Sequence, residues 1–286
     1  MAPKWFSDIA NWCGSAVHQA KPLSGGCSDP VYCVELANST RVLVKLATPS
    51  AAPDYLPAQA CGLEYIERMR PNSTPAVIGC NEQVLALQWL SEIAPSRSDW
   101  YAAGELLAEL HQCKQAQFGF ERDNYCGASK QNNGWHKSGV EFFREQRLRP
   151  QIERAKQQGL LDNGSRAKLE QLLTALENVI PQQSPSLIHG DLWSGNWLFT
   201  TAGPRLIDPA CYYGWPEAEL AMTQMFGAPP KYFYDVYQQH SDVSPDWWER
   251  VDYYNLYHWL NHLNLFGATY QAPLSQCIER CWSIPR

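Results

Sequence analysis

Long apolar runs and an excess of positive charge are both missing from this sequence. No apolar stretch approaches the roughly 20 residues that a membrane-spanning helix requires, and residues 1–20 do not resemble a signal peptide. Lysines and arginines are scattered, and the formal net charge is −6. Because a nucleic-acid partner would need a basic surface, we expect no nucleic acid among the partners. Because no membrane-spanning stretch and no signal peptide are recognised, we also expect no membrane partner and a cytoplasmic location.

Cysteine spacings typical of zinc or redox sites are also missing. The ten cysteines contain no C-x-x-C pair and no Cys/His cluster with zinc spacing, so we expect mostly free thiols in a reducing compartment. What the sequence does have is 286 residues with 45% hydrophobic and 18% charged side chains. This composition is typical of a globular protein with a sizeable core.

The first 90 residues carry most of the strand signals. Their β-branched, alternating or apolar runs predict strands at 31–36, 41–46 and 84–90, and helical spacing predicts a helix at 58–69. A short amphipathic helix is expected earlier, around Ile9, Trp12 and Val17. This part is predicted to be a β-rich N-lobe that ends in a hinge near residues 88–91.

The remaining residues, 91–286, have mainly helical patterns. Ser98 or Asp99 is expected to cap the first helix, and later helices are predicted at 166–180 and 253–266. Between these two helices, a β-rich insert is predicted with strands at 186–189, 196–200 and 204–208. We therefore predict an α+β fold with two lobes, in which residues 1–90 form the N-lobe and 91–286 a larger, α-rich C-lobe.

The β-rich insert carries the residues with the clearest chemistry. An apolar strand leads into His189-Gly-Asp191, Asn196 follows five residues after Asp191, and Asp208 ends the next hairpin. Phosphoryl transfer needs a carboxylate that accepts the proton of the attacking hydroxyl, and oxygen ligands that hold Mg²⁺. The spacing matches a kinase catalytic loop, with Asp191 as the base and Asn196 and Asp208 as the metal ligands.

The N-lobe offers candidates for binding the phosphates of ATP. Lys45 lies late in a predicted strand, where it could reach the α- and β-phosphates; otherwise it would be a solvated edge-strand lysine. The segment Ser24-Gly25-Gly26-Cys27-Ser28 could form a loop whose backbone amides approach the phosphate oxygens. Cys27 in this loop is either an oxidisable thiol that blocks nucleotide entry or an inert small side chain.

These residues resemble the fructosamine kinase family, which includes fructosamine-3-kinase and ketosamine-3-kinase, within the aminoglycoside/choline kinase superfamily. The resemblance covers nearly the whole chain. It is carried by His189-Gly-Asp-Leu-Trp-Ser-Gly-Asn196, Ile207-Asp-Pro-Ala-Cys-Tyr-Tyr-Gly214, Phe118-Gly-Phe120, Asn133-Gly-Trp135, Phe142-Phe143, Arg147-Leu148 and Leu260-Asn-His-Leu-Asn-Leu-Phe-Gly267.

The resemblance implies a protein-kinase-like fold and a reaction. Asp191 would accept the proton, Asn196 and Asp208 would bind Mg²⁺, and Lys45 would contact the phosphates of ATP. Gln88, Trp89 and Leu90 would form the hinge that receives adenine. The implied reaction is ATP-dependent phosphorylation of a sugar hydroxyl, the 3-hydroxyl in this family, on a small-molecule or protein-bound ketosamine. Because the 3-phosphate makes the adduct labile, the family is linked to deglycation.

Two positions depart from the family's pattern. Where kinases of this type place a glutamate partner for the lysine, this sequence has Gln59. Glu64 lies about 140° further round a helix and is a poor substitute. Two interpretations are open: Gln59 makes a neutral contact with Lys45, or another residue of this helix corresponds to the family's glutamate. A second tryptophan that follows Trp135 in the family is replaced by Gly139.

Three side chains are candidates for contact with the sugar. The indole of Trp193 offers a flat apolar face and one N–H donor, although it could equally pack the loop onto the C-lobe. Trp135 and Glu219 are weaker candidates, and Glu219 is more typical of a residue that braces the catalytic loop. His189 is expected to anchor that loop through a backbone contact.

Two other functions compete with this interpretation. The first is a kinase for an aminoglycoside, an amino alcohol or a free sugar. A polycationic substrate would need an acidic pocket, whereas the loop after Asp191 is Leu-Trp-Ser-Gly. The second is a catalytically inactive, nucleotide-binding regulator, which only Gln59 favours. A protein kinase is disfavoured because no Ala-Pro-Glu segment follows Asp208.

Overall fold

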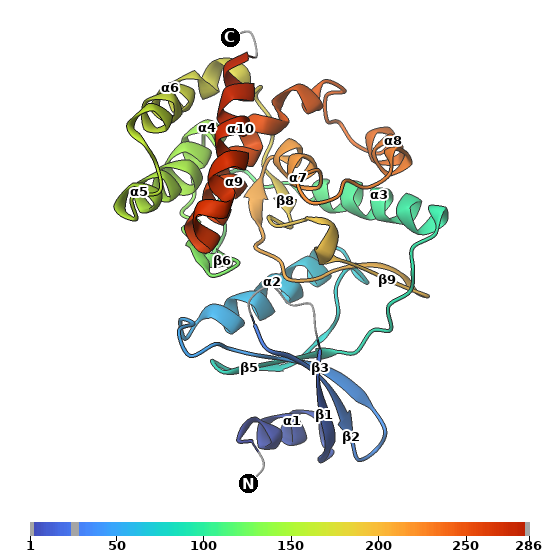
Figure 1. The fold of residues 1–286 in the computed structure, drawn as a ribbon. Helices are drawn as coiled ribbons and strands as arrows, with labels where there is room; N and C mark the ends of the chain where they lie inside the picture. Colours follow the sequence, from blue (N-terminus) through green and yellow to red (C-terminus); the bar gives the residue numbers. More distant parts are fainter. Residues whose placement is uncertain (1–2, 24–28, 284–286) are drawn as a thin grey trace.

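The computed structural model describes residues 3–23 and 29–283 (Figure 1). Its first part is an antiparallel five-stranded sheet with the order β1-β2-β3-β5-β4, and one helix packs on each face. The elements of this part are α1 (Trp5–Cys13), β1 (Val17–Leu23), β2 (Val31–Leu36), β3 (Arg41–Leu46), α2 (Tyr55–Met69), β4 (Val77–Cys80) and β5 (Val84–Gln88).

Alternation along β3 decides which face of the sheet each side chain covers. Val42 and Val44 are buried with Ile9 of α1, whereas Leu43 packs against the cluster formed by α2. Lys45 follows the same period, so its side chain lies on the α2 face and is only 7% exposed. Because α2 lies between the sheet and the rest of the chain, this face carries Lys45 toward the second part of the molecule (Figure 1).

The second part is mostly helical and is built around one hydrophobic cluster that runs from α3 to α10. Its helices are α3 (Arg97–His111), α4 (Gly139–Phe142), α5 (Arg149–Gln157), α6 (Asn163–Val179), α7 (Pro216–Met222), α8 (Lys231–Gln239), α9 (Val251–Phe266) and α10 (Gln271–Ser283). Shorter helical segments are η1 (Phe143–Leu148), η2 (Ser194–Asn196), η3 (Trp247–Arg250) and η4 (Gly267–Tyr270). Ile66 of α2 joins the same cluster and ties the two parts together.

Short antiparallel ladders in the second part position the candidate site. The pairs are β6 (Asn124–Cys126) with β7 (Ser129–Gln131), β8 (Ser186–Ile188) with β11 (Tyr212–Gly214), and β9 (Trp197–Thr200) with β10 (Gly203–Leu206). The loop from β8 to β9 holds residues 189–196, and Asp208 follows β10. The β8–β11 and β9–β10 ladders therefore bring Asp191, Asn196 and Asp208 into one region.

The α+β architecture with a β-rich first part and a helical second part confirms the predicted two-lobed fold. The strands expected at 31–36 and 41–46 are confirmed at both ends. The change from sheet to helices falls between Gln88 and Arg97, and the boundary between residues 90 and 91 stays a prediction. Among residues 3–23 and 29–283, no helix combines the length and apolar character needed to cross a membrane.

Two local predictions were wrong. The cap of α3 is Ser96 and not Ser98 or Asp99, because the Ser96 hydroxyl accepts from the Asp99 amide while the Asp99 carboxylate accepts from the Ser96 amide. Val17 begins β1 and does not continue the first helix, which ends at Cys13 before Gly14 in a left-handed conformation.

Candidate active site

The predicted catalytic loop, residues 189–196, leaves β8 through a sharp turn at Gly190. This residue has φ +82°, and a Cβ atom there would collide with the carbonyl oxygen of Ala210. Any L-residue would therefore be strained and crowded at this position. The turn allows the chain to pass close to the segment after Asp208 and sends Asp191 to the end of the strand.

Side chains hold every backbone amide of residues 189–191. The amides of His189 and Gly190 donate to the two carboxylate oxygens of Glu219 on α7, the second over 3.0 Å. The amide of Asp191 donates to Nδ1 of His189 over 3.3 Å, and Nε2 of His189 lies 2.8 Å from the carbonyl oxygen of Ile207. Nε2 therefore carries the proton, and burial lowers the pKa of His189, which keeps the ring neutral.

The Asp191 carboxylate lies in a half-buried position among other acidic groups. Desolvation raises its pKa well above the usual range, and the negative charges of Asp208 and Glu219 raise it further. A hydrogen bond with the thiol of Cys126 acts in the opposite direction. A carboxylate with a raised pKa is suited to accept a proton, which is the chemistry expected at a base.

Asn196 and Asp208 present oxygen atoms on the neighbouring side. Nδ2 of Asn196 donates to the backbone carbonyl of Asp191 over 2.7 Å, which fixes the orientation of the amide and leaves its Oδ1 free of partners among the described residues. Asp208 has φ +57°, an uncommon conformation that aspartate tolerates better than most residues. Carboxylate and amide oxygens are the ligands that Mg²⁺ prefers, so these two residues fit the predicted metal.

Lys45 reaches across from the N-lobe to Asp208, and its Nζ forms an ion pair with Oδ1 of that residue. No hydrogen bond or ion pair joins Lys45 to Gln59 in the described part of the chain. Gln59 lies on α2, and its Oε1 is buried without a partner among the described residues. Glu64 is exposed on the same helix, as expected from its angular position. The neutral contact considered for Gln59 is therefore not formed in this structure.

The predicted hinge follows β5. Gln88 pairs with Val42 at the end of that strand, and Trp89 and Leu90 continue without regular structure. In the described part of the chain, the backbone groups of Trp89 and Leu90 form no backbone hydrogen bond, so they are available to a ligand such as adenine. The predicted phosphate-binding residues Gly25, Gly26 and Ser28, together with Cys27, lie outside the described residues.

A cavity of about 470 Å³ opens beside Asp191 and is mostly apolar. It is lined by Cys126, Gly127, Ala128, Asp191, Trp193, Phe226, Asn261, His262, Leu265, Phe266 and Tyr270. The ring of Trp193 lies edge-on to Phe226, with 6.1 Å between centroids, and also covers Gly195, where an added Cβ would collide with it. Trp193 thus both packs onto its own loop and lines the cavity.

The other candidates for contact with the sugar lie elsewhere. Trp135 is 41% exposed, lies tilted against Tyr213 with 6.2 Å between centroids, and does not line the Asp191 cavity. Glu219 is 1% exposed and is engaged with the loop amides. Gly139 is packed so tightly against Phe118 and Trp215 that an added Cβ would lie 2.6 Å from each, so no side chain fits there.

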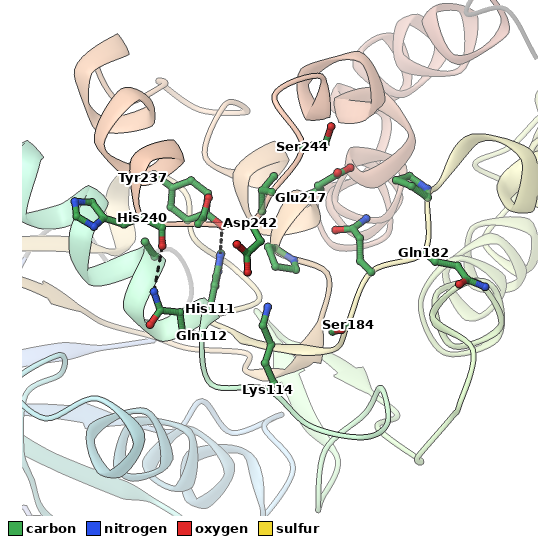
Figure 2. Close-up of a pocket in the computed structure, with 16 residues that line it drawn as sticks. His111, Gln112, Lys114, Gln182, Ser184, Glu217, Tyr237, His240, Asp242 and Ser244 are labelled. Carbon is green, nitrogen blue, oxygen red and sulfur yellow. Dashed lines mark hydrogen bonds between the residues drawn. The ribbon is translucent and has the colours of Figure 1, made fainter.

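A second cavity, of about 410 Å³, is lined by His111, Lys114, Glu217 and Tyr237 among other residues (Figure 2). His111 lies between this cavity and Glu219: its Nδ1 is 2.7 Å from the Tyr237 hydroxyl, and its Nε2 is 3.7 Å from Oε2 of Glu219. Burial lowers the pKa of His111, so the ring is neutral. Asp191 lines the first cavity and does not line this one.

The comparison with known proteins decides the family. The profile of the fructosamine kinase family matches residues 4–283. The chain belongs to the fructosamine kinase family. A probable ketoamine kinase of Synechocystis sp. is 37% identical over 277 residues, which cover 94% of this chain and 92% of that protein. Another, from Lactiplantibacillus plantarum, is 34% identical over 261 residues, 89% of this chain and 91% of its own.

Solved structures agree with this family. A protein of Thermobifida fusca assigned as a fructosamine-3-kinase superposes with a TM-score of 0.92 at 30% identity, covering 99% of this chain and 100% of that one. An aminoglycoside phosphotransferase bound to AMP-PNP and hygromycin B has a TM-score of 0.64 at 14% identity, over 99% and 100% of the two chains, which shows the shared fold. As a fructosamine kinase family member, the chain is an ATP-dependent small-molecule kinase.

The structure of this fructosamine kinase family member also adds two residues that sequence patterns did not single out. Asp29 lies two residues before β2 and accepts a hydrogen bond of 2.8 Å from the Tyr55 hydroxyl. Burial is the largest influence on the pKa of Asp29 and raises it, whereas the charge of Lys45 lowers it and that of Asp208 raises it. His258 on α9 is buried near Asp191. Neither belongs to a local motif, and only the folding of distant segments brings them to the site.

Proposed function

We propose that this chain transfers the γ-phosphoryl group of ATP to a sugar hydroxyl of a ketosamine. One observation supports this proposal: Asp191 lines an aromatic cavity and also neighbours a cluster of groups suited to binding phosphates and a metal ion. Lys45, Asn196 and Asp208 make up the cluster, and Trp193 and Phe226 belong to the cavity. A nucleotide on one side and an acceptor on the other would meet at this carboxylate.

Each residue has a role that follows from its position. Asp191 orients the acceptor hydroxyl and takes its proton as the new oxygen–phosphorus bond forms and the bond to the β-phosphate oxygen breaks. Lys45 turns from Asp208 to the phosphates of ATP, and the free backbone groups of Trp89 and Leu90 receive adenine. Asn196 and Asp208 would hold Mg²⁺, which supplies charge neutralisation for the phosphates when bound.

The lining of the cavity favours a sugar adduct over a polycationic antibiotic. Among the lining residues that the structure describes, Asp191 is the only carboxylate, and most of the others are apolar or aromatic. Indole and phenyl faces suit the apolar face of a sugar chain or ring, whereas several ammonium groups would need more acidic partners. The family implies that the 3-hydroxyl is the acceptor and that the product serves deglycation, and both belong to this proposal.

The test is ATP consumption with Mg²⁺ on five acceptors: a ribulosamine, a fructosamine, free ribulose, choline and kanamycin. We expect turnover on a ketosamine, and a loss of roughly 10³-fold in Asp191→Asn, because a general base contributes on the order of 10²–10⁴ to the rate. ATP binding should persist in the variant. Turnover only on choline or kanamycin would overturn the ketosamine assignment, and ATP binding without any turnover would favour the regulator.

A further inference from the structure

Three side chains with metal-binding chemistry converge at one end of the acceptor cavity. Cys126 ends β6, Asp191 lies on the catalytic loop, and His258 lies on α9. A carboxylate oxygen, the thiol sulfur and a ring nitrogen of these residues all lie within 4.8 Å of one another. In a tetrahedral zinc site, bond lengths of about 2.0–2.3 Å place the ligand atoms roughly 3.3–3.8 Å apart, so small rotations of the side chains would close the cluster.

His258 supplies an observation that ordinary packing does not explain. The residue is only 6% exposed, yet Nδ1 has no hydrogen-bond partner among the described residues. A buried polar atom without a partner costs about 1–3 kcal/mol of stability, and a bound ligand is one way to supply the missing partner. Cys126 is also buried, and Nδ2 of Asn261 donates to its sulfur over 3.4 Å.

We propose that Cys126, Asp191 and His258 form a binding site for a borderline divalent metal ion such as Zn²⁺. Sulfur, imidazole nitrogen and carboxylate oxygen are the three ligand types that Zn²⁺ takes, whereas Mg²⁺ prefers oxygen alone. The site is therefore chemically distinct from the one at Asn196 and Asp208. On binding, the thiol would lose its proton to solvent, and three protein ligands would leave a fourth position for water.

Occupation of this site would inhibit phosphoryl transfer. A metal bound to the Asp191 carboxylate withdraws the electron pair that must accept the proton of the acceptor hydroxyl. The ion also occupies space at the cavity wall that Cys126 helps to form. Inhibition should therefore be competitive with the acceptor and not with ATP. The inhibition rests on the proposed function, whereas metal binding by the three side chains does not.

The test of binding uses Co²⁺ as a spectroscopic substitute for Zn²⁺, with the full chain and with neither ATP nor acceptor present. We expect about one equivalent to bind with a thiolate-to-cobalt charge-transfer band in the near ultraviolet and with the visible bands of tetrahedral cobalt. Added Zn²⁺ should displace it. The band should vanish in Cys126→Ser, and affinity should fall roughly tenfold or more in His258→Gln, since even outer partners of ligands are worth about 10–100-fold.

Matched controls remove the same residue types elsewhere. Cys33→Ser on β2 and His240→Gln after α8 should leave the cobalt spectrum and affinity unchanged. Persistence of the full band in Cys126→Ser, or its absence from the wild-type protein, would overturn the proposed site. Circular dichroism of each variant establishes that it is folded.

A second measurement needs no variant. Zn²⁺ should slow the alkylation of Cys126 in the wild-type protein, as followed by mass spectrometry, without slowing that of Cys33. Equal protection of both cysteines would contradict a site at Cys126. If Co²⁺ binds as described while no acceptor is turned over, the metal site stands and the proposed function fails; turnover without cobalt binding gives the opposite result.

Discussion

On the C-lobe side of the active site, each backbone amide from His189 to Asp191 donates to a side chain, and Glu219 accepts two of these bonds. On the N-lobe side, Lys45 is held by a single ion pair with Asp208. The neighbouring helix contributes Gln59, whose buried Oε1 has no partner among the described residues. The three amides of the predicted catalytic loop thus all have side-chain partners without any ligand, whereas a buried polar atom on the N-lobe side has none among the described residues.

This contrast indicates how the two sides contribute. A loop whose amides are all satisfied by buried side chains keeps Asp191 in one position, and such preorganisation lowers the barrier of the chemical step. A lysine with one half-exposed partner can exchange that partner for phosphate oxygens. We therefore expect changes on the C-lobe side to reduce kcat and changes on the N-lobe side to alter KM for ATP.

Among the variants that compare the two sides, the largest effect is expected from weakening the hydrogen bonds between Glu219 and the amides of His189 and Gly190, which we call the brace. In Glu219→Gln only one side-chain oxygen remains to accept from the two amides of His189 and Gly190, and an NH₂ group would face a donor. We expect kcat to fall roughly hundredfold with little change in KM for ATP, since a displacement of about 1 Å can cost that much. Steady-state kinetics measure both constants.

The matched control for the brace is Glu249→Gln, which changes an exposed glutamate on η3 and should leave both constants unchanged. Equal losses of kcat and of apparent ATP affinity in Glu219→Gln would show that the brace supports the whole cleft and not the loop alone.

The second prediction concerns the scaffold beneath the loop. Arg147 is fully buried, donates to the carbonyl of Asn132 over 2.8 Å and to Oδ1 of Asn133 over 2.6 Å, and covers the ring of Tyr212 at 4.0 Å. Arg147→Met leaves these acceptors unpaired, so the free energy of unfolding should fall by about 3 kcal/mol. Urea denaturation measures this change.

Arg149→Met is the matched control for Arg147→Met in the urea denaturation, because it removes an arginine from the surface. Arg149 forms ion pairs with the exposed Glu145 and Glu170, and its loss should cost less than about 1 kcal/mol. If the two variants were equally stable, the buried hydrogen bonds of Arg147 would contribute nothing beyond those of a surface pair.

The third prediction separates two tryptophans that the sequence offered for the same role. Trp193 lines the Asp191 cavity and Trp135 does not. Loss of an indole contact worth about 1.5–2.5 kcal/mol predicts that Trp193→Ala lowers kcat/KM for the ketosamine roughly tenfold to hundredfold, with KM for ATP unchanged. Trp135→Ala should change neither kcat/KM for the ketosamine nor KM for ATP. A larger effect in Trp135→Ala would place the acceptor outside this cavity.

The smallest effect is expected from giving Lys45 an additional ion-pair partner on the N-lobe side. Gln59→Glu supplies the carboxylate that Lys45 lacks on α2, and a partly exposed ion pair is worth up to about 1 kcal/mol. KM for ATP should therefore fall about threefold to fivefold, whereas Gln59→Met, of similar size and without charge, should not lower it. A rise of KM in Gln59→Glu would show that the position does not face Lys45 when ATP is bound.

Local patterns explain how much of this molecule the sequence predicted. The strands at 31–36 and 41–46 contain β-branched residues and partly alternate, and the helix at 253–266 repeats its apolar residues over about four turns, so these elements were predicted. Strand β1 was missed because Lys21 and Pro22 interrupt its alternation, and β6 and β7 because three residues carry no period.

The candidate site likewise contains residues that a local pattern predicted and residues that it missed. Asp191, Asn196 and Asp208 lie within eighteen residues and share a motif, so spacing alone brought them together. Cys126 and His258 reach Asp191 from 65 and 67 residues away, through β6 and α9. No local signal marks such residues, because their meeting depends on packing between elements and not on the order of residues within one.

The most direct test of the central claim is to determine where the phosphate is attached. Phosphorus and carbon NMR of the product from ATP and a fructosamine, formed by the wild-type protein and by Asp191→Asn, reports both the reaction and the reacting hydroxyl. We predict a 3-phosphate in the wild-type reaction and almost none with the variant. A phosphate on another hydroxyl, or an equal yield from Asp191→Asn, would contradict a ketosamine 3-kinase in which Asp191 is the base.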